Sequence, residues 1–151
     1  MPKKTTIQRA RRAKREGKSA STQAGEFVRE EIEAIRKGEH GARSTKQAIA
    51  IGLSKARRAG VNLPVPKKGS MPDKTREQAK RELAEAEKGE PRKPSRKRIQ
   101  ATLKALKREG RVAASKEALS EHSRAVARQR TFAQKSASAK KAARTRQSAS
   151  L

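Results

Sequence analysis

The sequence predicts a mostly α-helical protein that combines a small helical hairpin and extended helices with disordered basic segments at both ends. Three observations support this fold class. Ala supplies 26 of the 151 residues and favours helix while burying little area. Leu, Ile, Val and Phe number only 20, a share below the roughly 20% at which highly charged chains are expected to be disordered. Gly and Pro then divide the chain into helix-length segments.

The first segment, residues 1–21, is a basic arm that carries eight Lys and Arg against Glu16. Residues 5–16 have helical potential, but Ile7 is their only large apolar side chain. We therefore expect the arm to be ordered only when it is bound to a partner.

Residues 22–65 are the best candidate for a folded unit, because nine of the 20 large apolar residues lie between Phe27 and Leu63. Over residues 21–35, apolar side chains share one helical face and acids lie nearly opposite. The apolar positions are Val28, Ile32 and Ile35, and the acids are Glu26, Glu30 and Glu33. The pattern predicts an amphipathic helix with an acidic, salt-bridging outer face.

A second helix is predicted over residues 45–59. Gly38 and Gly41 interrupt the first helix, Ser44 and Gln47 have the spacing of a capping box, and Gly60 is a C-terminal cap. The two helices would form a hairpin.

Gly52 lies on the buried stripe of this second helix, together with Ile49, Leu53 and Ala56. Gly costs about 1 kcal/mol of helix propensity, so its place suggests that another helix backbone comes close. Residues 48–54 also follow the residue order of a helix-turn-helix turn. The second helix of that motif would be very short, and we favour one helix. Residues 61–65 are expected to fold back over the hairpin.

Residues 66–94 form a linker and a third helix, which begins at Ser70 or Pro72 and ends at Gly89. This helix is nearly all charge and is expected to be a solvated spacer held by pairs four residues apart. The next break is the sequence GEPRKPS, residues 89–95.

Residues 95–134 are predicted to contain two basic helices. Ser95 caps the first, which ends at Gly110, and Ser115 caps the second, which runs to about Gln134. The first has an apolar stripe and an opposite basic row. The stripe is Ile99, Leu103 and Leu106, and the row is Lys97, Lys104 and Arg108. Residues 135–151 are a low-complexity basic tail that is expected to be disordered.

One internal similarity links residues 7–21 (IQRARRAKREGKSAS) and residues 99–115 (IQATLKALKREGRVAAS). Both begin with IQ and contain KREG followed by Ala-Ser. The similarity is compatible with a duplication or with two ordinary helices that end in Gly.

The charge of the chain indicates a polyanion as its partner. The net charge is +26, and residues 92–151 hold 18 Lys and Arg against three Glu. A nucleic-acid backbone can neutralise such a density of cations. Stacking-based recognition is disfavoured because Phe27 and Phe132 are the only aromatic residues. Duplex DNA bound through its phosphates, with little sequence specificity, is therefore favoured.

The candidate binding residues are the Lys and Arg of the arm, of the end of the second helix and of the fourth helix. They are Arg9, Arg11, Arg12, Lys14, Arg15, Lys55, Arg57, Arg58, Arg96, Lys97, Arg98, Lys104, Lys107 and Arg108. Lys55, Arg57 and Arg58 are expected to form an exposed cluster at a helix end.

Two other classes of function stay open. A ribosome-associated or RNA-binding accessory protein shares this basic, aromatic-poor composition, and an adaptor could use residues 22–59 to bind a protein. A membrane-surface helix over residues 96–109 lacks the usual aromatic anchors, and no apolar run approaches the length of a membrane span. No membrane partner is expected.

The sequence contains no sign of catalysis or of a cofactor. It has no Cys, and its two imidazoles, His40 and His122, are expected to be solvated rather than metal ligands. No phosphate-binding Gly loop, nucleophile elbow or paired acid motif is present. A non-enzymatic protein without metal or cofactor is expected.

Two stretches carry a resemblance to a known family. They are residues 25–60 (GEFVREEIEAIRKGEHGARSTKQAIAIGLSKARRAG), followed by LPVPKKG, and the later KPSRKRIQATLKALKREGRVAAS. Over most of residues 7–128 the chain resembles a family of small, basic bacterial proteins often labelled DNA-binding or plasmid stabilisation proteins. The resemblance implies a nucleoid- or plasmid-associated protein of the bacterial cytoplasm. It supplies no active-site residues.

Overall fold

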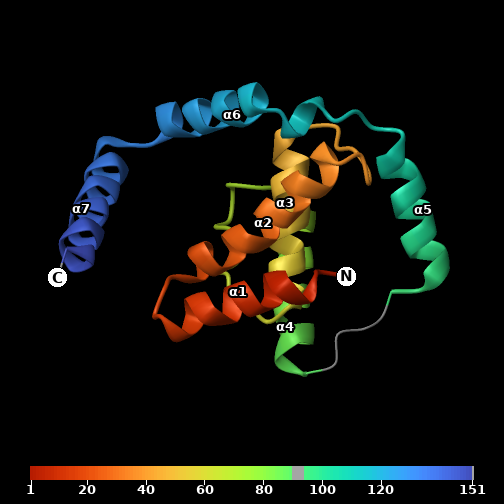
Figure 1. Ribbon diagram of the computed structural model, residues 1–151, viewed down its shortest axis with the longest axis horizontal. Coiled ribbons are helices and arrows are strands. Elements are labelled where there is room, and N and C mark those ends of the chain that lie inside the picture. Colours follow the sequence, from red (N-terminus) through yellow and green to blue (C-terminus); the bar gives the residue numbers. More distant parts are fainter. Residues whose placement is uncertain (90–93, 151) are drawn as a thin grey trace. The chain divides into compact units, whose positions relative to one another are not determined.

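The computed structural model of the chain describes residues 1–89 and 94–150 (Figure 1). These residues form helices without a β-strand, which confirms the predicted mostly α-helical class. The helices are α1 Lys4–Arg15, α2 Ala20–Arg36, α3 Thr45–Arg58, α4 Asp73–Glu87, α5 Arg96–Lys107, the 3₁₀ helix η1 Val112–Ala114, α6 Lys116–Gln129 and α7 Phe132–Ala149. The chain divides into two compact units, residues 1–115 and 116–151. The predicted break at residues 89–95 includes residues 90–93, which lie outside the described residues.

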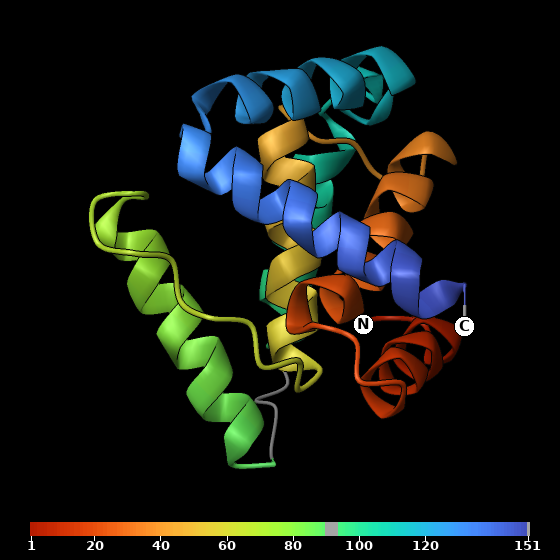
Figure 2. The ribbon, with the colours of Figure 1, turned by 90° about the vertical axis from the view of Figure 1, so that its left-hand side faces the viewer.

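Helices α2 and α3 form the predicted hairpin, and Figure 2 shows α3 between α2 on one side and α4 on the other. Phe27 is 1% exposed and belongs to a cluster with Val61 and Leu63, so the segment after α3 folds back as expected. The Ser44 hydroxyl accepts the Gln47 N–H at 3.2 Å, which caps α3. Because α3 is continuous through residue 52, the helix-turn-helix alternative is excluded.

Gly52 is the point at which the two hairpin helices come closest. A Cβ atom placed on it would lie 2.6 Å from the Cα of Val28, a distance that real Cβ contacts do not reach. The predicted close approach of a second helix backbone is therefore confirmed.

The expectation that the basic arm is ordered only when bound is wrong for residues 4–15, which form α1 and pack on α2. Thr6, Ala10 and Ala13 are buried in α1. These side chains are small, so α1 can be buried without the large apolar residues that its composition lacks. The Lys3 N–H, at the start of α1, donates to both carboxylate oxygens of Glu30 at 3.1 and 3.2 Å. This bond satisfies a backbone donor that a helix start leaves unpaired.

Helix α4 is also not the solvated spacer that its composition predicts. Ala79 and Glu82 are 3% and 4% exposed, and α4 packs on α3. The Ser54 hydroxyl of α3 donates to the Glu82 carboxylate, and the Gln78 amide donates to the same oxygen at 3.1 Å. A buried carboxylate with two donors is satisfied, which allows an acid to lie in this contact.

The segment after α5 anchors that helix to the hairpin. The Gly41 N–H donates to the Leu106 carbonyl at 2.9 Å, and the Ala42 N–H donates to the Gly110 carbonyl at 3.1 Å. A Cβ on Gly41 would overlap the backbone carbonyl of Glu109, so no side chain fits there. η1 packs against α2 and α3, and Ala114 is 0% exposed.

In the second unit, α6 ends at Gln129 and α7 begins at Phe132, so the predicted single helix over residues 115–134 is wrong. Thr131 and Gln134 form a reciprocal capping box that starts the new helix. Residues 135–149, predicted to be disordered, lie in α7. This helix has no buried residue, and its high Ala content is a local reason for it to be helical.

Candidate nucleic-acid interface

The deepest charged group in the hairpin is Glu31 of α2, whose side chain is 0% exposed. Its Oε2 lies 2.6 Å from Nζ of Lys55 on α3, and its Oε1 lies 3.2 Å from Nε2 of His40 in the connecting loop. Two expectations are therefore corrected. His40 is buried rather than solvated, because it packs against a buried carboxylate. Lys55 forms a partly buried ion pair, with its side chain 21% exposed, instead of an exposed phosphate contact.

The positions of Glu31 and Lys55 on their helices indicate this cluster, although the predictions above did not include it. At 100° per residue, Glu31 lies 40° from Ile35 and 60° from Val28, on the apolar face of α2. Lys55 likewise lies 60° from Gly52 on α3. Opposite charges on the inner faces of two neighbouring helices predict a buried ion pair, since an unpaired buried charge is costly.

The other two cations at the end of α3 differ from each other. Arg57 is 8% exposed, which contradicts the expectation of an exposed cluster. The apolar stem of an Arg side chain can be packed against the protein, which permits this burial. Arg58 is exposed, and its Nε donates to the Ser54 carbonyl at 3.4 Å. Of the expected cluster, only Arg58 stays accessible to a phosphate.

The acidic row of α2 lies largely against α1, so the predicted acidic outer face is wrong for two of its members. Glu30 is 8% exposed and accepts the Lys3 N–H. Glu26 Oε2 lies 3.9 Å from Nη1 of Arg9. Glu33 stays at the surface in a salt bridge on its own helix, and that bond lowers its pKa. The row therefore has the salt-bridging role that was expected, but much of it holds α1 in place.

Helix α1 presents exposed cations toward its C-terminal end. Arg11, Lys14 and Arg15 are exposed, and none of them forms an ion pair with another described residue. Arg12 is also exposed, but it shares the Glu16 carboxylate with Lys18 at 2.8 Å each. The Lys18 ammonium, aided by Arg12, holds the pKa of Glu16 below its ordinary value of 4.5. We call Arg11, Lys14 and Arg15 the α1 surface.

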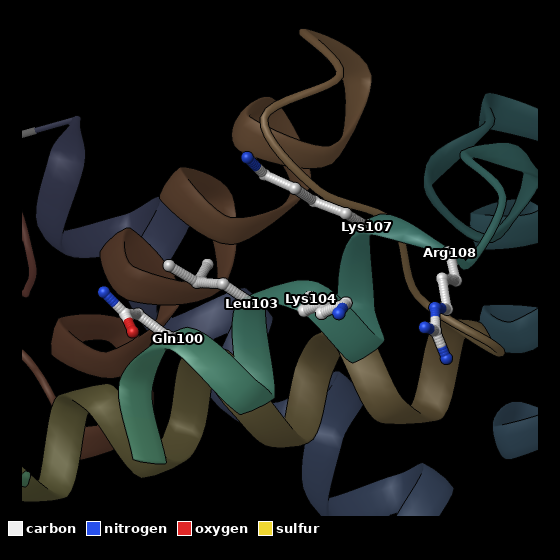
Figure 3. A pocket seen from close by; sticks show the side chains of 5 residues that line it. All are labelled: Gln100, Leu103, Lys104, Lys107 and Arg108. Carbon is white, nitrogen blue, oxygen red and sulfur yellow. The ribbon is translucent and has the colours of Figure 1, made fainter. Parts of the chain in front are cut away.

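Helix α5 presents the second cationic surface, and all of its Lys and Arg are exposed. Figure 3 shows Lys104, Lys107 and Arg108 projecting from the helix around a hollow that Gln100 and Leu103 also line. We call the exposed cations of this helix and its C-terminal cap the α5 surface. They are Arg96, Lys97, Arg98, Lys104, Lys107 and Arg108, and within the described part of the chain none of them forms an ion pair.

The predicted apolar residues of α5 share one face of the helix, but this face is not buried. Ile99 and Leu103 are 42% and 40% exposed, and α5 has no buried residue. The helix is held through its C-terminal end, by the bonds of Leu106 and Gly110 to the loop after α2.

Charge is segregated by element in the first unit. α1 carries six Lys and Arg and α5 carries five, and neither helix contains an acid. α2 and α4 together carry nine acids against six Lys and Arg. Nine acids of the first unit thus lie in α2 and α4, whereas α1 and α5 carry eleven cations and no acid. α3 also has no acid, but two of its four cations, Lys55 and Arg57, are paired or buried.

The described residues were compared with the requirements of a metal site and of a membrane-spanning helix. Among residues 1–89 and 94–150, no group of three His, Cys, Asp or Glu is placed to hold a metal ion. Over the same residues, no helix has an apolar stretch of the length that crossing a lipid bilayer requires.

Comparison with known proteins gives one match. Residues 11–68 match the model of a family of unknown function (DUF6496). The matched stretch runs from the second half of α1 through the hairpin and ends before α4, so it includes the α1 surface and leaves the α5 surface outside. Neither the curated proteins nor the solved structures contain a match to the chain.

Proposed function

We propose that the protein binds nucleic acid without catalysing a reaction, and that its target is duplex DNA held through the phosphate backbone with little sequence preference. In this role it would be a nucleoid- or plasmid-associated accessory of the bacterial cytoplasm. The observation that carries the proposal is the segregation of charge, which leaves α1 and α5 as exposed cationic helices without acids.

The physical argument is the release of counterions. Each phosphate that a Lys or Arg neutralises releases a condensed cation, so binding to a polyanion gains free energy with each contact. A cation contributes only when it is not already neutralised. Lys55 and Arg57 are therefore removed from the candidate residues, since one is paired with Glu31 and the other is buried.

The packing of the hairpin favours nucleic acid over a protein-binding adaptor. An adaptor would use the acidic and apolar faces of residues 22–59. Glu30 and Phe27 on those faces are covered within the unit, by contacts to the start of α1 and to the segment after α3. The cations of α5 and most of those of α1 stay exposed in this unit.

The proposal is tested by measuring affinity for a duplex as a function of salt. If about eight phosphates are neutralised, log affinity should fall against log salt with a slope near −7. A slope shallower than about −2 contradicts the proposal. Competition between duplex DNA and structured RNA at fixed salt tests which of them is the target. Preferential binding of RNA would show that the target is RNA and not duplex DNA.

Matched variants localise the contacts. K97Q/K104Q removes two cations from the α5 surface and should make the slope shallower by about 1.8. K74Q/R81Q removes two exposed cations from α4, where acids outnumber bases, and should leave the slope unchanged. If the two variants change the salt slope equally, binding depends on the total charge of the chain and not on the position of its cations.

Truncation of the tail tests the second unit. Deleting residues 135–151 removes five cations, all of them in the second unit. We expect weaker affinity and a shallower slope, with the fold of the first unit intact by circular dichroism. If neither affinity nor slope changes, α7 does not contact the nucleic acid.

A further inference from the structure

We propose that one copy of the chain holds two nucleic-acid duplexes at the same time, one on the α1 surface and one on the α5 surface. This inference rests on the proposed function, because it requires that both surfaces bind phosphate. It goes further in assigning a bridging activity to the protein.

The two helices present cations in the same pattern. In α1, Lys4, Arg11 and Arg15 lie within 40° of one another at 100° per residue. In α5, Lys97, Lys104 and Arg108 have the same spacing of seven and four residues. Each row is long enough to follow several phosphates, because a helix of 12 residues extends about 18 Å. Each helix therefore presents a row of cations along one face, and the α1 surface lies at the C-terminal end of its row.

The two surfaces lie toward opposite ends of α2. Arg11, Lys14 and Arg15 are at the C-terminal end of α1, next to the turn that leads into α2. The C-terminal end of α5 is bonded to Gly41, which follows the other end of α2. α2 has 17 residues and so spans about 25 Å. Figure 1 shows the turn between α1 and α2 on the side of the first unit opposite to α5.

The separation also makes simultaneous binding of two duplexes possible. Two polyanions repel each other strongly only within about one Debye length, which is near 8 Å at physiological salt. Duplexes held at opposite ends of α2, a helix about 25 Å long, are largely screened from each other. The first unit thus acts as a spacer.

The test measures whether the full-length chain, bound to one duplex, captures a second duplex. A biotinylated duplex is immobilised, the protein is added, and capture of a fluorescent duplex is measured after unbound protein is removed. The wild-type chain should capture it. Sedimentation should give one chain for each pair of duplexes.

Three variants of equal charge locate the activity. R11Q/K14Q/R15Q disables the α1 surface and K97Q/K104Q/R108Q disables the α5 surface. Each loses three phosphate contacts on one side, which corresponds to binding on the order of a hundredfold weaker at that surface at 0.15 M salt. Both should still occupy the immobilised duplex and should lose capture of the second one. K74Q/R81Q/K88Q removes three exposed cations from α4 and its C-terminal cap, outside both surfaces, and should keep capture.

The outcomes separate this inference from the proposed function. Binding with a steep salt slope but without capture by the wild-type chain overturns bridging and leaves the proposed function intact. Capture that is lost equally in the α4 variant, or kept in either surface variant with native circular dichroism, overturns the assignment to two surfaces. Capture by two chains for each pair of duplexes also overturns it. Absence of any binding removes both proposals.

Discussion

The contact between Gly52 and Val28 allows a sharp test of the hairpin, since the same substitution should have opposite effects at two glycines. Replacing a helix-interior Gly by Ala normally stabilises a protein by up to about 1 kcal/mol. Gly25 of α2 meets this condition, because a Cβ placed on it has no neighbour within 4 Å. G25A should therefore raise the free energy of unfolding by up to about 1 kcal/mol.

G52A should do the reverse. Its Cβ would lie 2.6 Å from the Cα of Val28 and 3.0 Å from the Val28 nitrogen. Backbone atoms cannot move aside as a side chain can, so α2 and α3 must separate along the contact that forms most of the core. Overpacking costs about 1–3 kcal/mol, and the upper part of this range applies to a contact with backbone. After the gain in propensity is subtracted, we expect a net loss of about 1–2 kcal/mol.

The assay is urea denaturation of both variants followed by far-ultraviolet circular dichroism. G25A and G52A should differ by about 2–3 kcal/mol in the free energy of unfolding, with similar dependence on urea. If G52A is as stable as G25A, the two helices are not in backbone contact at this position. The packing of α2 on α3 described above would then be refuted.

Three further predictions concern charges and the α5 stripe. E31Q should lower the free energy of unfolding by about 3–5 kcal/mol, because it leaves the partly buried Lys55 ammonium without its carboxylate. E33Q at the surface should lower it by less than about 1 kcal/mol. Equal losses in urea denaturation would contradict the buried pair. In an NMR titration, the pKa of Glu16 should lie below 4.5 and should rise in K18A. Because the folded pKa is lowered, this pair stabilises the fold above pH 4.5 and the effect is lost as the pH falls through the folded pKa. L103D should cost less than about 1 kcal/mol, since Leu103 is 40% exposed; a loss above about 2 kcal/mol would show that α5 packs through its stripe.

Local signals in the sequence were sufficient for the hairpin. The capping interaction of Ser44 depends on residues three apart, and the role of Gly52 follows from one costly residue on an apolar stripe. Both are consequences of short-range chemistry. The helical face that contains Phe27 could be placed in the same way, because periodicity reports which side of a helix is buried.

The packing of α1 and α4 was missed because counting large apolar residues underestimates contacts made by Ala. Ala10 and Ala79 are 5% and 3% exposed, although neither has the volume that marks a core position in a sequence. In each case a carboxylate on the packed surface accepts hydrogen bonds from the neighbouring segment, as Glu30 does from Lys3 and Glu82 from Ser54. Such contacts join residues 27 or 28 positions apart, and a helical period carries no information about them.

The same long-range contacts decide which cations can bind a partner. Lys55 and Lys104 look alike in sequence, since each is a Lys on an amphipathic basic helix. Lys55 is neutralised by Glu31 of α2, whereas Lys104 is exposed and forms no ion pair with another described residue. A net charge of +26 spread evenly over the chain would place few cations within one Debye length, about 8 Å, of any phosphate row. The fold instead places nine acids on α2 and α4, three of them buried, and concentrates exposed cations on α1 and α5. Variants of equal charge but different position should therefore bind differently, and total charge alone should be a poor predictor of affinity.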